Sequence, residues 1–503
     1  MKRSEFSAIP DEVIFHRILP YFEYRWILNV GRLVCKYWNE NYKSIETFDF
    51  SVNYYGNDNY WERLLNDVHS GELEKVTGLN FRLPLAWNYD LELQQKLITK
   101  LSNLKELSLG PCACEYPLIM TKLEHLERVV LNLRYINIVE FLKNCKSKIK
   151  SFDISSVEYK QDFSFDIEWP LEHLSVSGLS TNSWISLLNS KFARNSLKSL
   201  KICNCGILPN EAVFDLIGNL DCLTELDCSE KVLWKHMRKI GKLKKLTCNK
   251  VFRGAESELD LSLLTNLEYL CLMSNDLVGS SFKHLQNMNH LTELILANNK
   301  IENAAALSSV TSLTHLDLSN NYIRDEGLKD FCQLVNLKYL SLEYNQIGSI
   351  GANYLSKIVQ LEQLNLARNY IGEIGVENYG NLQALRILNL NANNIGDGLK
   401  FLACCNSLNQ LYVASNKISS KGLIDFCKVS MPNLKVLTIS NNNVGKAVAL
   451  LVCFKGTEVR ADNCNIGLTD AVQYVAEKGI SSFSNQLINT KNKLLSIFDS
   501  SMF

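Results

Sequence analysis

The sixteen cysteines and eight histidines are the side chains of this sequence best suited to metal binding or nucleophilic catalysis. Closely spaced cysteines occur at 112/114, 203/205 and 404/405, and these do not form two separated C-x-x-C knuckles. Tetrahedral zinc needs such knuckles, or a cysteine pair followed by spaced histidines. The spacing therefore predicts no metal site and no cofactor. Several cysteines stand at leucine or asparagine positions of a repeat, where a free thiol acts as a small hydrophobe.

Sequence motifs of catalysis are also missing. The chain lacks the phosphate-binding G-x-x-x-x-G-K-[ST], the zinc-protease H-E-x-x-H and the nucleophile elbow G-x-S-x-G. His173 and His315 fall on predicted strand faces, where a hydrogen-bonded surface histidine is far commoner than a catalytic one. We therefore expect a protein that binds partners and is not an enzyme.

Length and charge narrow the class of partner. The 503 residues suffice for about two to four domains, and 46% of them are hydrophobic. Lys+Arg and Asp+Glu number 53 each, and this zero net charge argues against a nucleic acid or a membrane surface as partner. The first residues lack the apolar run of a signal peptide, and no stretch reaches the ~18 apolar residues of a membrane helix. We expect reduced thiols and a place in the cytoplasm or nucleus.

A leucine repeat occupies most of the chain. The unit L-x-x-L-x-L-x-x-N-x-I begins at Leu291 and Leu313, and then every 24 residues at Leu337, Leu361 and Leu385. It continues more loosely upstream and downstream. Two leucines that flank one residue place both apolar side chains on one face of a short strand. This unit resembles the leucine-rich-repeat family.

An asparagine recurs where each unit turns inward after its strand. A buried amide at this point can satisfy backbone groups that have lost water. The predicted structural ladder consists of Asn275, Asn299, Asn321, Asn345, Asn369, Asn393, Asn416 and Asn442. Segments such as 327–331 and 351–355 predict short helices on the outer side. The resemblance implies an α/β solenoid, a horseshoe with a parallel concave sheet and convex helices over residues 101–467, followed by a C-terminal cap and tail at 468–503.

The segment Ile9–Asn41 belongs to no repeat. Pro10, followed by two acidic residues, favours the start of a helix, and apolar residues at helical spacing continue as far as Trp38. The segment predicts three short helices. Because about 40 residues bury such apolar faces poorly, we expect this unit to dock on another surface.

The order of residues in this segment resembles the F-box family. I-P-x-E from Ile9, I-L-x-Y-F from Ile18 and V-C-K-x-W from Val34 stand where that family carries L-P-x-E, I-L-x-Y-L and V-C-K/R-x-W. The resemblance implies a small three-helix F-box at 5–45, with a linker and N-terminal cap of irregular repeats at 46–100. It also implies binding to a Skp-type adaptor in a cullin-RING (SCF) ubiquitin ligase. The implied adaptor-binding residues are Ile9, Pro10, Ile18, Leu19, Leu28, Val34, Cys35 and Trp38.

The predicted concave sheet is the remaining candidate surface. Residues beside the inward leucines face outward, and in the middle units they combine aromatic and apolar anchors with acidic neighbours, as interface hot spots do. We predict substrate contacts at Tyr269, Met273, Ile295, His315, Asp317, Tyr339 and Glu343. The whole pattern predicts the non-catalytic substrate-recognition subunit of an SCF-type ubiquitin ligase. The alternatives are a leucine-rich-repeat scaffold whose F-box-like segment is a cap, an F-box protein acting outside ubiquitination, and a host-directed mimic.

Overall fold

The computed structural model divides the chain into two compact units, Met1–Ile240 (unit 1) and Gly241–Phe503 (unit 2). It describes residues 47–51, 78–82, 103–109, 123–131, 145, 147–154, 169–177, 179–203, 211–228, 240–249, 261–282, 285–454 and 456–464. The predicted F-box at 5–45, with all eight adaptor-binding residues, lies outside the described residues. The predicted C-terminal cap and tail at 468–503 also lie outside them.

The described strands of unit 1 pair in parallel. They are β1 (Thr47–Ser51), β2 (Gly78–Arg82), β3 (Glu106–Leu109), β4 (Arg128–Leu131), β5 (Ser151–Ile154), β6 (His173–Ser177), β7 (Ser199–Cys203) and β8 (Glu225–Cys228). Each strand pairs with the next in the same register, so that Phe152 of β5 lies opposite Leu174 of β6. Burial alternates along the strands: Phe152 and Ile154 are buried, whereas Ser151 and Asp153 are half-buried on the other face. The leucine pattern thus sets which face of the sheet meets the core.

Three described helices of unit 1 lie in the segments that connect its strands. They are α9 (Thr181–Asn189), α10 (Lys191–Ser196) and α11 (Glu211–Gly218). Ser180 caps α9, since its hydroxyl accepts a hydrogen bond of 3.1 Å from the Ser183 amide. Trp184 of α9 is 1% exposed, so this helix is anchored by a large aromatic side chain in the core.

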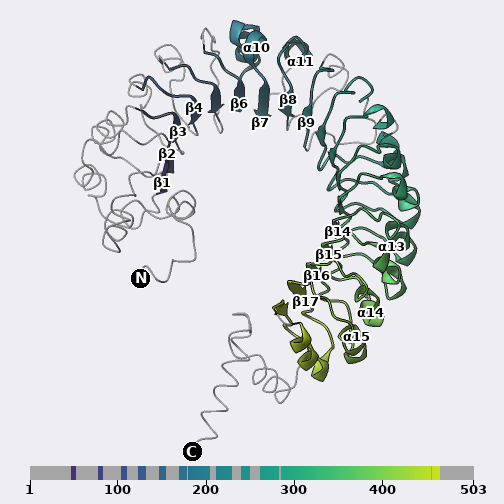
Figure 1. Cartoon of the computed structure of the whole chain (residues 1–503). Helices are drawn as coiled ribbons and strands as arrows, with labels where there is room; N and C mark the ends of the chain where they lie inside the picture. Colours follow the sequence, from purple (N-terminus) through teal and green to yellow (C-terminus); the bar gives the residue numbers. More distant parts are fainter. Residues whose placement is uncertain are drawn as a thin grey trace, which may run out of the picture. The chain divides into compact units, whose positions relative to one another are not determined.

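Unit 2 contains ten described strands, which also pair in parallel. They are β9 (Lys245–Thr247), β10 (Tyr269–Cys271), β11 (Glu293–Ile295), β12 (His315–Asp317), β13 (Tyr339–Ser341), β14 (Gln363–Asn365), β15 (Ile387–Asn389), β16 (Gln410–Tyr412), β17 (Val436–Thr438) and β18 (Glu458–Arg460). The second leucine of each repeat occupies the centre of its strand, and Leu294, Leu316 and Leu340 lie side by side. Figure 1 shows β14 to β17 on one side of unit 2 and α13, α14 and α15 on the other.

Short helical segments cover the convex side of unit 2. The α-helices are α13 (Ser349–Leu355), α14 (Leu399–Leu402) and α15 (Ser420–Phe426). The 3-10 helices are η7 (Gly279–Phe282), η8 (Leu285–Asn287), η9 (Ala305–Ser309), η10 (Asp325–Leu328), η11 (Phe331–Gln333), η12 (Ile374–Val376), η13 (Tyr379–Asn381), η14 (Gly396–Gly398) and η15 (Gly445–Cys453). The helix predicted at 351–355 is part of α13, whereas the one predicted at 327–331 is two 3-10 turns. A 3-10 helix rises about 2.0 Å per residue against about 1.5 Å for an α-helix, so it spans the same path with fewer residues.

Glycine lets neighbouring convex segments approach closely. A Cβ atom on Gly351 would lie 3.1 Å from the Cα of Asp325 and 2.9 Å from Cγ2 of Ile347. Such contacts are too short for any larger residue without movement of the backbone. The glycine therefore sets how tightly α13 packs on the preceding repeat.

The asparagine ladder joins consecutive repeats of unit 2. All eight predicted amides are buried, with at most 5% of the residue exposed. Asn369 donates from Nδ2 to the carbonyl oxygens of Leu342 (2.9 Å) in the preceding repeat and Leu366 (3.0 Å) in its own. Its Oδ1 accepts a hydrogen bond of 3.1 Å from the Ile347 amide. Each side chain thus supplies both donors and an acceptor at the junction of two turns.

The ladder ends at a cysteine. Cys464 stands in β18's repeat where the other units have asparagine, and its Sγ lies 3.3 Å from the Ile439 carbonyl oxygen. A thiol is a weak donor with no counterpart to the amide oxygen. The last described repeat therefore keeps weaker contacts to the carbonyl oxygens of Ile439 and Asp462 (3.6 Å) and loses the acceptor that the amide oxygen supplies.

Candidate functional site

The seven predicted substrate-contact residues lie on or just after four consecutive strands of unit 2. Tyr269, His315 and Tyr339 share one register row across β10, β12 and β13, with Glu293 of β11 between them. Ile295 and Asp317 form the next row. Met273 and Glu343 each lie two residues after the end of their strand. Of the seven side chains, that of His315 is exposed and the other six are half-buried. Strand alternation thus brings residues from four repeats onto one face.

Two tyrosines and one histidine supply the aromatic part of this face. The rings of His315 and Tyr339 are stacked with centroids 5.8 Å apart and an interplanar angle of 22°. Burial, followed by the neighbouring Cys271, raises the pKa of Tyr269 to about 12. The pKa of Tyr339 is also raised, mainly by burial and then by Asp317. Both phenols therefore stay neutral near pH 7 and combine an apolar ring with a hydroxyl that can bond a partner.

The two carboxylates of the predicted site are each held by one oxygen. Oδ1 of Asp317 accepts a hydrogen bond of 2.9 Å from the Ser319 amide. Oε2 of Glu343 accepts one of 2.9 Å from Nδ2 of Asn365. Within the described part of the chain their other oxygens have no such bond. The face thus combines stacked rings with fixed acceptors, which suits a protein surface that presents donors or basic groups.

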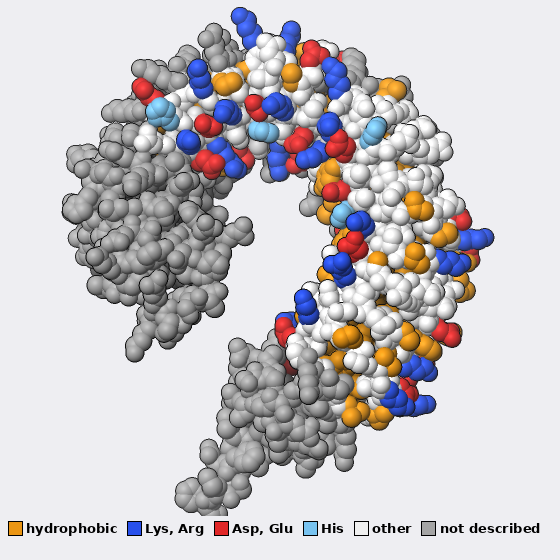
Figure 2. All heavy atoms as spheres, in the orientation of Figure 1, with side chains coloured by type: hydrophobic (Ala, Val, Ile, Leu, Met, Phe, Trp, Pro, Cys, Tyr) orange, Lys and Arg blue, Asp and Glu red, His pale blue; other side chains and the backbone are white. Residues whose placement is uncertain are grey.

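The strand face of unit 1 is a charged surface that our reasoning from sequence missed. Lys201 of β7 lies 3.1 Å from Asp227 of β8. Burial raises the pKa of Asp153, against the opposing effects of a hydrogen bond from Ser175 and the charge of Lys201. Figure 2 shows Lys, Arg, Asp and Glu side chains gathered along the strand side of this unit.

The described cysteines are free thiols, and most of them are buried. Burial raises the pKa of Cys405 to about 12 and that of Cys464 to about 11. Burial also raises the pKa of Cys145. A raised thiol pKa lowers the fraction of thiolate, which is the nucleophilic form. These cysteines act as core side chains.

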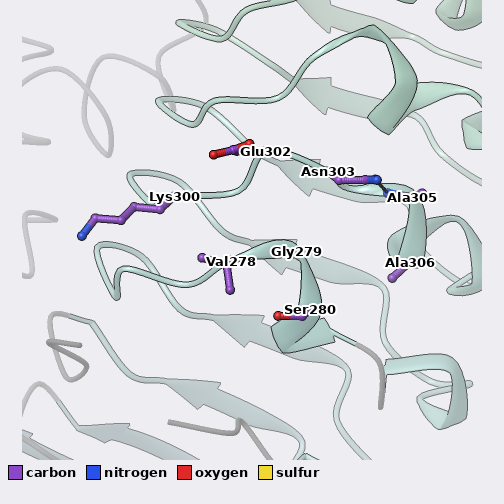
Figure 3. A pocket seen from close by; sticks show the side chains of 8 residues that line it. All are labelled: Val278, Gly279, Ser280, Lys300, Glu302, Asn303, Ala305 and Ala306. Carbon is purple, nitrogen blue, oxygen red and sulfur yellow. Dashed lines mark hydrogen bonds between the residues drawn. The ribbon is translucent and has the colours of Figure 1, made fainter. Parts of the chain in front are cut away.

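A cavity of about 410 Å³ opens between the loops that lead to η7 and η9. Its lining consists of Val278, Gly279, Ser280, Lys300, Glu302, Asn303, Ala305 and Ala306. Figure 3 shows Lys300 extending away from Ala305 and Ala306, and the Lys300 ammonium lies 3.1 Å from Asp276 outside the lining. Oδ1 of Asn303 is bonded to the Ala305 amide at 2.9 Å. The cavity therefore has few polar groups directed at a ligand.

The described residues offer neither a metal site nor a membrane-spanning helix. Among those that the structure describes, no group of three His, Cys, Asp or Glu side chains could hold a metal ion. The helices in the described ranges are all too short or too polar to cross a bilayer.

Comparison with protein families identifies the repeats. Leucine-rich-repeat models match residues 290–347, 313–371 and 404–427. The chain therefore carries leucine-rich repeats, as predicted, and its parallel strands fit a leucine-rich-repeat solenoid. No F-box model matches. A search of curated proteins finds no match.

Solved structures share this fold at low identity. The complex of TLR13 with ssRNA13 aligns with 78% of this chain and 67% of that chain, with a TM-score of 0.53 and 17% identity. An internalin from Listeria monocytogenes aligns with 78% of this chain and 88% of its own, at 19% identity and a TM-score of 0.45. A leucine-rich-repeat protein from Leptospira interrogans aligns with 81% and 89%, at 18% identity and a TM-score of 0.40. At such low identity, the likeness to the TLR13 complex concerns the fold alone.

Proposed function

We propose that this chain is the substrate-recognition subunit of an SCF-type ubiquitin ligase. Residues 5–45 bind a Skp-type adaptor, and the strand face of unit 2 binds a target protein. A separate conjugating enzyme then modifies lysines of the captured target. The chain raises the effective concentration of target near that enzyme and performs no bond chemistry itself. This assignment places its action in the cytoplasm or nucleus.

The observation that carries the proposal is the order of residues ahead of the repeats. The I-P-x-E, I-L-x-Y-F and V-C-K-x-W stretches beginning at Ile9, Ile18 and Val34 follow one another at the spacing of an F-box. The geometry of β10–β13 supports the proposed binding of a target protein, because it brings aromatic anchors and carboxylates together on one face. An interaction surface without a catalytic group suits a subunit whose task is capture.

Adaptor binding is the first test. The intact chain and a Pro10→Ala/Trp38→Ala variant are compared in a pull-down with a purified Skp-type adaptor, with far-ultraviolet circular dichroism to verify the fold of both. We expect the parent to bind and the folded variant to lose binding. A parent chain that does not bind the adaptor would reduce residues 5–45 to a cap on a leucine-rich-repeat scaffold.

Target capture is tested separately on the strand face. Tyr269, Met273 and Tyr339 are replaced together by alanine in the intact chain, and proteins that co-purify with the adaptor-bound complex are quantified. We expect loss of the captured target with adaptor binding unchanged. The same target recovered in full by the triple variant would exclude this face. A Val335→Ala exchange in the exposed segment between η11 and β13 is the control.

A further inference from the structure

In unit 2, the residues at one repeat position all have a left-handed backbone, although their side chains differ. It is the residue directly before each ladder position, and φ there lies between 53° and 61°. These residues are Ser274, Asn298, Asn320, Tyr344, Arg368, Ala392, Ser415, Asn441 and Asn463. Asparagine tolerates this conformation best among residues other than glycine, because its short polar side chain bonds locally. Four of the nine positions hold asparagine, which is the choice expected for stability alone.

Tyr344 and Arg368 are exceptions in two adjacent repeats. The Tyr344 amide bonds the Ala367 carbonyl oxygen at 2.8 Å, and the Arg368 amide bonds that of Asn391 at 2.7 Å. Asn320 makes the same bond to Glu343 at 2.7 Å, so the backbone connection does not depend on the side chain. A large side chain in a left-handed conformation is uncommon and strained. The two residues therefore gain nothing for the fold that asparagine would not supply.

The side chains of these two residues are turned to solvent and ordered against each other. Tyr344 is 55% exposed, and the guanidinium carbon of Arg368 lies 5.8 Å from the centre of its ring. Tyr322 and Tyr370, each directly after a ladder asparagine, are 49% and 67% exposed. We call Tyr322, Tyr344, Arg368 and Tyr370 the tyrosine edge. It spans three consecutive repeats on the loops that leave the strands.

The same repeats expose further apolar side chains. Ile350 and Ile374, at equivalent positions of consecutive repeats near the start of α13 and η12, are 58% and 67% exposed. Some cations of unit 2 pair with carboxylates, as Lys338 does with Glu362 at 3.0 Å. Within the described residues Arg368 has no carboxylate partner. Stacking holds its planar fork in place while leaving its N–H groups for an anion.

We propose that the tyrosine edge binds a partner-protein segment that carries a carboxylate beside an apolar side chain. The carboxylate pairs with the guanidinium of Arg368 over the Tyr344 ring, and the apolar side chain packs on the exposed tyrosines. Tyrosine and arginine are among the residues most enriched in interface hot spots. This surface is separate from the strand face and independent of the F-box assignment.

A protein fits the edge better than a nucleic acid does. Aromatic rings and arginine also stack on bases, but a phosphate backbone needs an excess of positive charge. Glu326 in η10 and Glu373 directly before η12 are exposed in the same repeats, and the whole chain has zero net charge. Acidic neighbours repel phosphates, whereas a single carboxylate can be seated directly at the guanidinium.

The test uses the full chain, short random peptides displayed on phage, and the variant Tyr344→Asn/Arg368→Asn. We expect the parent to enrich peptides with Asp or Glu next to an aliphatic or aromatic residue. The affinity of these peptides, measured by fluorescence anisotropy, should fall at least about tenfold in the variant. Its urea-denaturation midpoint should stay unchanged or rise, because asparagine relieves the left-handed strain.

Ala392→Asn is the matched control, since it introduces the same residue at the same repeat position outside the tyrosine edge. It should keep peptide affinity. A lower denaturation midpoint for Tyr344→Asn/Arg368→Asn would overturn the inference, because the side chains would then serve the fold. So would failure to enrich acidic peptides, peptide binding equal in parent and variant, or tighter binding of an oligothymidylate than of any peptide.

Discussion

Replacing Asn369 by alanine tests how the repeats are joined. The change removes the only hydrogen-bond acceptor that the buried Ile347 amide has among the described residues. It also removes donors to Leu342 and Leu366, whose carbonyl oxygens keep bonds from Asn345 and Asn393. An unsatisfied buried amide costs about 1–3 kcal/mol, and each lost bond to a retained partner about 0.5–1.5 kcal/mol. We therefore expect a loss of about 2–6 kcal/mol in the free energy of unfolding.

Urea denaturation followed by circular dichroism measures this loss, and hydrogen exchange locates it. Exchange of the Ile347 amide should accelerate the most, with smaller effects in repeats farther away. Asn381→Ala, on the exposed end of η13, is the control and should change stability by less than about 0.5 kcal/mol. If Asn369→Ala were as stable as this control, the ladder would not be what joins the repeats, and leucine packing alone would have to suffice.

Three further substitutions have definite directions. Tyr379→Phe should raise the free energy of unfolding by about 1 kcal/mol in a denaturant titration, because the Tyr379 hydroxyl is buried without a hydrogen-bond partner in the described residues and burial raises its pKa. Gly351→Ala should lower it by about 1–3 kcal/mol, since the added methyl group would lie 2.5 Å from Oδ1 of Asp325, and a gain in stability would contradict the packing described. Burial raises the pKa of Asp153 above 3.8, so the folded chain holds this proton more tightly; the penalty for its charge grows as the pH rises through the unfolded-state pKa and is complete above the folded-state pKa. Asp153→Asn should thus be more stable than the parent at about pH 7, with the difference vanishing at about pH 3; a pH series of thermal melts decides this.

The repeats and their ladder were predictable because their physical requirements fix the residue type. Only apolar side chains fill the narrow interior, and only an amide supplies donors and an acceptor together. Leu316 and Asn321 therefore recur as leucine and asparagine, and the family models confirm these repeats. At the convex segments, the fold does not restrict the residue type as strictly. This explains why a helix expected at 327–331 is a pair of 3-10 turns.

The tyrosine edge could not be predicted in the same way. In a sequence, glycine or asparagine indicates a position with left-handed backbone, whereas tyrosine and arginine, as at Tyr344 and Arg368, do not. Their conformation is that of the repeat position, because φ is also positive at the equivalent residues of the other described repeats in unit 2. The predicted contacts on β10–β13 share a face because side chains alternate along a strand. This alternation can be counted in the sequence, so the shared face was predictable. Whether they bind a target, and whether residues 5–45 form an F-box, stay predictions with the tests given above.

The shared amides also shape how such a gene can change. Because every junction in the regular part of unit 2 uses the same donors and acceptors, residues 345–368 could be deleted and Asn369 would meet Leu318 and Ile323 where Asn345 does now. Duplication of one whole repeat would likewise create one more junction of the same chemistry. Loss of a single residue within a repeat would instead displace a leucine from the interior. For this chain, a mutation that adds or removes a whole repeat is a smaller structural event than one that removes a single residue.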